Sequence, residues 1–174
     1  HTAFGAAIIK AVRGWSDYSG YYFSLFLTYF SDAVIQCSIW GIRICQFIIA
    51  VCFYLSVYLW IRIVVVKVFG IDKENVIPIA FLYFITSLYY FVENEDFLWF
   101  CASVIYLIPL TFVFVGIICM IYILDTEKYQ YIGFPMVIGF LAGGAVLNIA
   151  AFGCIAYIMT AYWGIVVRKK IKIS

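Results

Sequence analysis

The residues of this chain that could do chemistry are polar side chains set inside apolar sequence. Asp32 and Arg43 are the only charges in the stretch YFSDAVIQCSIWGIRICQFI, residues 29–48. On a helix they share one polar face with a threonine and two glutamines. This polar stripe consists of Thr28, Asp32, Gln36, Arg43 and Gln46. Because an isolated charge inside a bilayer costs at least about 2.5 kcal/mol, we expect the stripe to face headgroups, a water-filled cavity or another subunit.

The other reactive residue types form no catalytic or metal-binding pattern. His1 is the sole histidine, which argues against histidine-ligated haem, copper or zinc and against a histidine-activated nucleophile inside the membrane. The six cysteines form no CxxC pair and lie in apolar runs, where cysteine acts as a small hydrophobic residue. The acidic sequence ENED, residues 93–96, is expected to be a solvated turn, because a calcium loop needs a longer pattern of ligands. The sequence therefore predicts no catalytic residue, no cofactor and no metal site.

The composition places the chain in a lipid bilayer. It has 174 residues, of which 67% are hydrophobic and 11% charged, with a mean hydropathy of +1.09. A soluble domain has about 45–50% apolar and about 25% charged residues, so this chain cannot cover its surface with polar groups. The net charge of +2 provides no electrostatic footprint for nucleic acid. We therefore expect one all-α integral membrane domain over residues 1–174.

The apolar runs predict a helical bundle that follows an interfacial N-terminal region. Residues 4–42 are expected to form interfacial helices, the first of them amphipathic and anchored by Trp15, or else a first span. The predicted transmembrane helices are residues 44–66, 76–92, 97–124 and 134–167. The bundle then has four spans, or five if residues 21–40 also cross the membrane.

Two local features are expected to interrupt these runs. As one helix, residues 21–66 would be about 69 Å long, more than twice the hydrocarbon thickness of about 30 Å. A break is therefore expected at WGIR, residues 40–43. Pro109 is expected to kink the third span and to free a backbone carbonyl near Ile105. Thr111 is in position to reach such freed groups.

The distribution of lysine and arginine favours four spans over five under the positive-inside rule. Five spans would place five basic residues on the side of the C-terminal tail and six on the other side. Four spans would put both termini on one side, with seven basic residues there and four opposite. The preferred topology is therefore an interfacial helix ahead of four spans.

The last predicted span carries a face of small residues. Gly139 and Gly143 form a GxxxG pair, and small residues recur every four positions further on. The packing face consists of Gly139, Gly143, Gly144, Asn148, Ala156, Thr160 and Gly164. Such a face lets helices approach closely, and its spacing fits packing within the chain as well as contact with another chain. Asn148 is expected to need a hydrogen-bond partner, and a substrate-lining role for Gly143, Gly144 and Asn148 is a further alternative.

The chain ends in a basic tail, RKKIKIS, at residues 168–174. Its basic residues are Arg168, Lys169, Lys170 and Lys172. The lysines fifth and third from the end resemble the KxKxx signal for return to the endoplasmic reticulum. The alternative is a basic flank that follows the positive-inside rule or that holds anionic lipid headgroups.

Together these features predict a protein that works through contacts rather than through catalysis. The leading expectation is a non-catalytic accessory or structural subunit of a larger membrane protein complex, for example a respiratory-type assembly of the mitochondrial inner membrane. Its partners would be other membrane subunits and lipids, some of them structural, and not nucleic acid. One alternative is a small ion channel or transporter with a pathway along the polar stripe. Another is a trafficking or biogenesis factor that resides in the endoplasmic reticulum.

Overall fold

The chain is helical wherever the structure describes regular backbone. This computed structural model describes residues 5–6, 8–10, 12–13, 22–35, 38–93, 100 and 103–167. The main helices are α2 (Tyr22–Ile35), α3 (Ile39–Ile63), α4 (Val76–Glu93), α6 (Ile108–Thr126), α7 (Gly133–Gly143) and α8 (Leu147–Tyr162). The short π-helical and 3-10 segments are η1 (Val64–Val68), η2 (Lys73–Asn75), η3 (Ser103–Leu107), η4 (Tyr129–Tyr131) and η5 (Trp163–Val167). The all-α fold class is confirmed for these residues.

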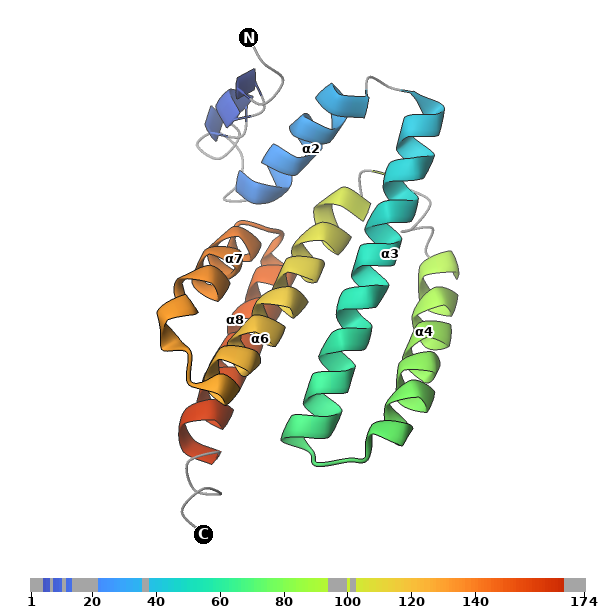
Figure 1. Cartoon of the computed structure of the whole chain (residues 1–174). Helices are drawn as coiled ribbons and strands as arrows, with labels where there is room; N and C mark the ends of the chain where they lie inside the picture. The colour runs from blue at the N-terminus through green and yellow to red at the C-terminus, as the bar shows by residue number, and fades with distance from the viewer. Residues whose placement is uncertain are drawn as a thin grey trace.

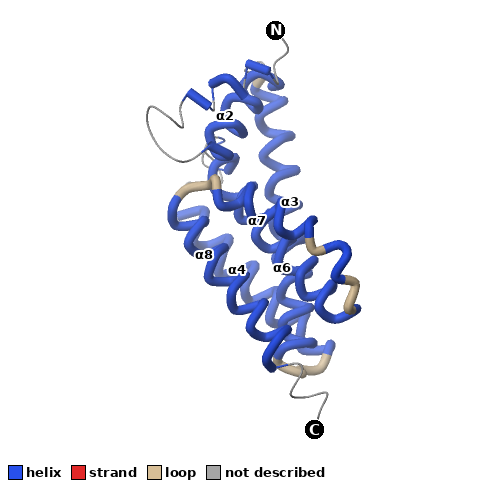
Figure 2. Tube along the Cα trace, turned by 90° about the vertical axis from the view of Figure 1, so that its left-hand side faces the viewer, coloured by secondary structure: helices blue, strands red, loops and turns tan. Residues whose placement is uncertain are grey.

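Helix α6 is the centre of the bundle. It packs against α3 on one side and against α7 and α8 on the other, and α4 packs on the far side of α3 (Figure 1). Helices α3, α6 and α8 run in the same direction, and α4 and α7 run back (Figure 1). We call the end where α3 and α6 finish the foot of the bundle; Lys67 and Asp125 form an ion pair there. The opposite end, the head, carries α2 (Figures 1 and 2).

Three continuous helical segments are long and apolar enough to cross a membrane. They are Ile39–Lys67, Ser103–Thr126 and Leu147–Val166, with 29, 24 and 20 residues. At a rise of 1.5 Å per residue each reaches the hydrocarbon thickness of about 30 Å. Large apolar side chains also cover the outside of the bundle: Phe47 of α3 and Phe140 of α7 are 71% and 69% exposed. A surface of this kind suits contact with lipid. The length of the three segments and this apolar surface support the expectation that the chain is a membrane protein.

The interior of the bundle leaves its few polar side chains well satisfied. Ser56, which is buried in α3, donates to the carbonyl of Phe53 at 2.7 Å. Thr160, which is buried in α8, donates to the carbonyl of Ala156 at 2.8 Å. Among the described residues no buried side-chain nitrogen or oxygen lacks a partner. This local satisfaction is what a polar group needs where no water can reach it.

The break between α2 and α3 lies earlier than the sequence predicted. We expected it at residues 40–43, but α3 already begins at Ile39 and Ser38 is its N-cap. The Ser38 side chain accepts a hydrogen bond from the backbone N–H of Gly41 at 3.4 Å. Serine at an N-cap satisfies a first-turn donor, and this outweighs the helix-weakening effect of a glycine inside the first turn.

Residues 134–167 form two helices, and the prediction of one long span was wrong. Helix α7 ends at Gly143 and α8 begins at Leu147, so the chain reverses over residues 144–146. The Gly144 carbonyl, which the turn leaves outside the helix, accepts hydrogen bonds from the N–H groups of Phe23 at 3.0 Å and Ser24 at 3.4 Å. Those N–H groups belong to the first turn of α2 and have no partner within their own helix. The N-terminal end of α2 and the C-terminal end of α7 therefore supply each other's missing hydrogen-bond partners.

Pro109, in the third predicted span, lies next to an irregular helical turn, close to the position where we expected it to disturb the helix. Pro109 lies in the first turn of α6, directly after the π-helical segment η3. Thr111 does not reach the carbonyl near Ile105 as expected; its hydroxyl donates to the carbonyl of Leu107, four residues earlier in the same helical segment, at 2.7 Å. The carbonyl of Ile105, four residues before the proline, accepts a hydrogen bond from the Ser24 hydroxyl of α2 at 3.4 Å. The freed carbonyl at Ile105 is thus a second point where α2 is attached.

Two adjacent glycines provide a test of the contact between α2 and the α7–α8 turn. A Cβ on Gly144 would overlap the ring of Tyr22, whereas a Cβ on Gly143 would meet open space. We expect Gly144→Ala to cost about 1–3 kcal/mol, because the Tyr22 ring must move and break its hydrogen bond to Phe140. Thermal unfolding of the full chain in mild detergent, followed by size-exclusion chromatography, measures the effect.

The matched control for this test is Gly143→Ala, which should unfold at the temperature of the parent protein. In a Tyr22→Ala background the Gly144→Ala change should have little further effect, because the two residues form one contact. Equal loss of stability from both glycine substitutions would contradict the contact.

Candidate functional site: the α7–α8 hairpin

The α7–α8 hairpin is the most specific construction in the described part of the chain. Its two helices run antiparallel and both pack on α6 (Figure 1). A core cluster joins the three helices around Val113 of α6, Ala142 of α7 and Ile149 of α8. Gly153 of α8 lies against Val113, where an added Cβ would be 3.2 Å from a side-chain carbon. Close packing of this kind in lipid depends on small residues at the contact.

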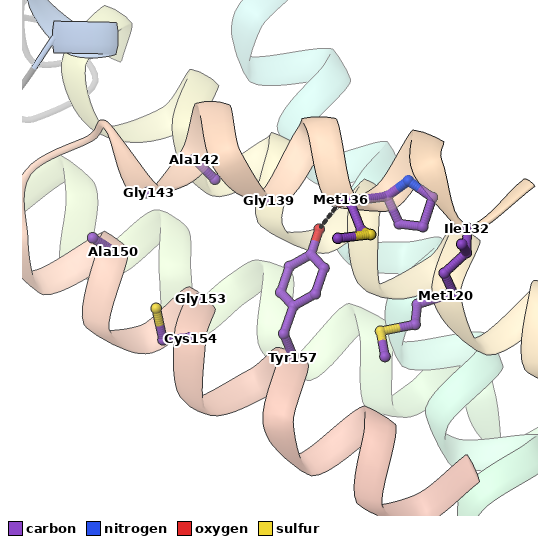
Figure 3. Close-up of a pocket in the computed structure, with 11 residues that line it drawn as sticks. Met120, Ile132, Met136, Gly139, Ala142, Gly143, Ala150, Gly153, Cys154 and Tyr157 are labelled. Atoms are coloured by element: carbon purple, nitrogen blue, oxygen red, sulfur yellow. Dashed lines mark hydrogen bonds between the residues drawn. The ribbon is translucent and has the colours of Figure 1, made fainter. Parts of the chain in front are cut away.

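Tyr157 of α8 forms a wedge between α7 and α6. Its hydroxyl donates to the carbonyl of Pro135 at 3.3 Å, across the gap between the two helices of the hairpin (Figure 3). Its ring lies over Gly139 of α7, where a Cβ would be 3.3 Å from the ring. On the other side the hydroxyl lies so close to Gly116 of α6 that a side chain there has no room. Two glycines from two helices thus make the space for one tyrosine.

Beside the wedge lies an apolar pocket of about 300 Å³. Small residues line both of its long walls: Gly139 and Gly143 on α7, and Ala150 and Cys154 on α8 (Figure 3). Two methionines, Met120 of α6 and Met136 of α7, lie at its other end (Figure 3). Tyr157 separates two helix faces that could otherwise approach each other closely, and the pocket is the space that remains.

The head of the hairpin is covered by α2. Tyr22 donates from its hydroxyl to the carbonyl of Phe140 at 2.6 Å, and its ring lies 5.5 Å from the ring of Phe140. Burial raises the pKa of the Tyr22 hydroxyl, so it keeps the proton that it donates. Phe23 and Ser24 then close the turn through their backbone N–H groups, which bond to Gly144. The first turn of α2 is therefore a cap on the C-terminal end of α7.

The structure assigns most of the predicted packing face to contacts within the chain. Gly139 lies under Tyr157, and a Cβ added to Gly164 would overlap the end of the Leu124 side chain of α6, which would have to shift. Ala156 packs against the cluster around Val113. Gly143 lines the pocket, and Gly144 lies under Tyr22.

Asn148, the most polar residue of that face, is exposed in the first turn of α8. The hydrogen bond expected from its amide is made to no described residue. Thr160 has its partner in its own helix, at the carbonyl of Ala156. The small residues of this face are thus mostly explained by packing, while the surroundings of Asn148 are not.

The polar stripe is not one face in the folded chain. The break at Ser38 puts Thr28 on α2 and both Arg43 and Gln46 on α3. Thr28 donates to the carbonyl of Ser24 at 2.9 Å, so its hydroxyl is satisfied in its own helix. Arg43 is exposed, with its guanidinium 5.8 Å from the ring centroid of Trp40. The side chain of Asp32 and all of Gln36 lie outside the described residues, as does the basic tail at 168–174.

Three residues of the hairpin site were missed by sequence reasoning: Tyr22, Gly116 and Tyr157. Tyrosine in an apolar run suggests a membrane interface, and nothing local shows that its ring fits over a glycine on another helix. Gly116 has no small partner three or four residues away that would make a small-xxx-small pattern, apart from a cysteine at 119. A search for isolated glycines in spans, each able to accept a large residue from a neighbouring helix, is the signal that would have found it.

Chemically, the hairpin can hold apolar groups and little else. Among the side chains that line the pocket, the Tyr157 hydroxyl is already bonded to the carbonyl of Pro135, and the Cys154 thiol is a weak donor. Over the described ranges there is no group of three His, Cys, Asp or Glu side chains that could hold a metal ion. The arrangement positions helices and excludes water, and it brings no nucleophile and base together.

Similarity to other proteins provides no function for this chain. No family model matches it, no curated protein matches its sequence and no solved structure matches its fold. The functional proposal below therefore rests on the contacts just described.

The wedge can be tested from the α6 side. Gly116→Ala should lower the thermal stability of the detergent-solubilised chain by about 1–3 kcal/mol, because the Tyr157 ring must swing away and lose its bond to Pro135. Gly133→Ala, which adds a methyl group in open space at the start of α7, is the matched control. The wedge is refuted if Gly116→Ala unfolds no earlier than Gly133→Ala.

Proposed function

We propose that this chain is a non-catalytic accessory subunit of a larger membrane protein complex. The proposal rests on one observation: the tyrosines and glycines with the most specific contacts in the described chain serve to pack helices together. Two tyrosines, Tyr22 and Tyr157, pack over glycines of neighbouring helices and hold these helices in place. The hydroxyl of each tyrosine is bonded to a backbone carbonyl. A packed helical body whose described residues assemble no reactive group is suited to bracing or spacing neighbours in the membrane. Which membrane contains the complex stays a prediction from the sequence.

The alternatives draw less support from the described residues. A conduction pathway along the polar stripe would need Thr28, Arg43 and Gln46 on one face, but they lie on two helices. Thr28 is bonded within α2, and Arg43 is exposed next to Trp40. The return signal for the endoplasmic reticulum depends on the tail, residues 168–174. No specific observation favours either alternative.

The direction of the helices supports a topology with more crossings than the three apolar segments alone. Because α3 and α6 run the same way, the chain between them must return through the membrane, and α4 with its 18 residues is long enough to do so. Because α6 and α8 also run the same way, residues 127–146 must run back from the foot before α8 begins, without having to reach the opposite surface. Helix α7 has 11 residues, about 16 Å, so its turn into α8 would lie within the apolar layer beneath α2.

This topology changes the balance of charge across the membrane. The tail that follows α8 would share the foot with Arg62, Lys67, Lys73 and Lys128, which makes eight basic residues. The head would keep Lys10, Arg13 and Arg43. Eight against three is a clearer bias than the seven against four expected for a single helix over residues 134–167. By the positive-inside rule the foot faces the cytoplasm or matrix.

Cysteine labelling tests the orientation. In a cysteine-free background, single cysteines at Ile71, Tyr131 and Ser174 should react with a membrane-impermeant maleimide from one side of sealed vesicles, and a cysteine at Ser38 from the other. If residues 127–174 cross the membrane only once, the cysteines at 131 and 174 will label from opposite sides, and the proposed topology is wrong. Labelling after detergent lysis controls for buried thiols.

The native mass of the chain tests the proposed role. Tagged protein extracted in mild detergent should run as a discrete assembly far above its own 20.0 kDa, with the same companions in mass spectrometry from each preparation. A monomeric multi-pass protein with the same tag sets the mass that detergent alone adds. Recovery of only a monomer or a small homo-oligomer would remove the accessory-subunit proposal.

A further inference from the structure

A second apolar cavity, larger than the hairpin pocket, runs along the lower half of the bundle. It has a volume of about 660 Å³ and lies between α3 and α8, with α6 as its floor. Ile117 and Ile121 of α6, both almost fully buried, form the floor. Trp60 lines the wall on α3, and Ala156 and Met159 line the wall on α8. We call this cavity the slot.

The upper end of the slot is closed by three aromatic rings. The ring centroid of Trp60 on α3 lies 5.1 Å from that of Phe114 on α6. The Phe114 ring in turn lies 6.2 Å from Phe152 of α8, in an edge-to-face arrangement. This row of rings joins the three helices at mid-height. The slot is therefore blind at the top, and whatever enters it must come from the foot or from the side.

The lower end of the slot is aromatic and then charged. Phe69, which is 68% exposed, and Trp163 line it there. One helical turn below Ile121, Asp125 forms the ion pair with Lys67 that marks the foot. Both side chains are about one-third exposed, at 37% for Lys67 and 33% for Asp125. An ammonium group has three donors, so Lys67 can bond to Asp125 and still donate to an anionic oxygen at the mouth of the slot.

The lining of the slot accepts only an apolar occupant. The α8 wall below Phe152 carries two side-chain hydroxyls. That of Thr160 donates to the carbonyl of Ala156 at 2.8 Å, and that of Tyr162 belongs to a side chain that is 61% exposed. Water in a cavity needs two to four polar partners, whereas the side chains that line the slot are nearly all aliphatic or aromatic. The occupant must therefore be hydrocarbon within the slot, whatever it carries outside.

The length of the slot identifies the kind of hydrocarbon. The α8 wall of the slot extends from Phe152 at the upper end to Trp163 at the lower end, a length of eleven residues or about 16 Å. This is close to half of the hydrocarbon thickness of about 30 Å, and so to the depth of one leaflet. A transmembrane helix of another subunit would need a groove through the full thickness, which the three rings prevent. A single acyl chain that enters from the foot fits both the length and the closed end.

We propose that the slot binds a membrane phospholipid, with one acyl chain between α3 and α8 and the phosphate beside Lys67. The headgroup lies at the foot, level with Phe69 and Trp163, where aromatic rings favour the interface between water and lipid. The ion pair with Asp125 holds the Lys67 ammonium at the mouth of the slot. The lipid fills the space that α3 and α8 leave open over α6, and it packs against both helices.

Photolabelling of the full chain tests the acyl-chain part of the proposal. The protein is reconstituted in phosphatidylcholine vesicles that contain a trace of phosphatidylcholine with a diazirine at mid-chain, irradiated and digested. Labels should concentrate on Ile121, Ala156 and Met159. Ala156→Phe, which fills the slot, should reduce this labelling about tenfold, equivalent to about 1.4 kcal/mol. Ala151→Phe makes the same change on an exposed face of α8 and should leave the slot labelling unaltered.

Met159→Trp narrows the slot from its exposed rim and serves if Ala156→Phe does not fold. Labels spread evenly over exposed positions such as Val51 and Leu55 of α3, with no effect of either slot-filling variant, would overturn the proposal. Cross-links from slot residues to a peptide of another chain, in place of lipid, would also overturn it.

The headgroup part is tested by a second set of probes. Diacylglycerol with the same diazirine chain lacks phosphate and should label the slot about tenfold less than phosphatidylcholine or phosphatidylglycerol. Lys67→Gln should remove this difference, while Lys128→Gln, another foot lysine, should preserve it. If Lys67→Gln lowers the labelling by both phospholipids equally, the effect is due to the phosphate. If it lowers the labelling by phosphatidylglycerol alone, the effect is due to the anionic headgroup, and the phosphate contact is overturned. Equal labelling by diacylglycerol in the parent protein would also overturn it.

Discussion

The structure depends on one constraint: a backbone carbonyl that leaves its helix inside lipid must find a donor in the protein. The helix ends next to Gly144, and within the continuous segment Ser103–Thr126 Pro109 withholds a donor from the carbonyl of Ile105. In both places the donor comes from the first turn of α2, through the backbone N–H groups of Phe23 and Ser24 and the Ser24 hydroxyl. One helix end, itself rich in unpaired donors, satisfies two acceptors on two other helices. Without α2 neither carbonyl would have this donor.

The second principle of the fold is that glycine makes room for tyrosine. Tyr157 lies over Gly139 and Gly116, and Tyr22 lies over Gly144. In each case an aromatic body provides the contact area and its hydroxyl bonds to a carbonyl of α7, at Pro135 or Phe140. Small residues in spans usually suggest that two backbones approach closely. Here they do the reverse, because the ring placed over them keeps the helices apart and leaves a cavity beside it.

The features that could be predicted from the sequence are those that depend on residues close to one another along the chain. The apolar runs predicted the positions of α3, α4 and α6, and Pro109 predicted a freed carbonyl near Ile105, although its donor is Ser24 and not Thr111. The reversal at Gly144 could not be predicted in this way, because its donors lie about 120 residues earlier. The same applies to Tyr157, whose ring fits against Gly116 on another helix. Under the proposed topology this one turn also decides the side of the membrane on which the chain after α8 lies, since each added reversal moves everything after it across the membrane.

The cap made by α2 has a consequence for how the protein is made. Tyr22 and its partner Phe140 are separated by 118 positions in the chain. At a synthesis rate of about 5–20 residues per second, the first turn of α2 leaves the ribosome roughly 6–24 s before its acceptor does. During that interval its donors have no native partner and must remain hydrated, which favours a waiting place at the membrane surface. Completion of the fold is then a late docking event, open to delay or assistance by the insertion machinery.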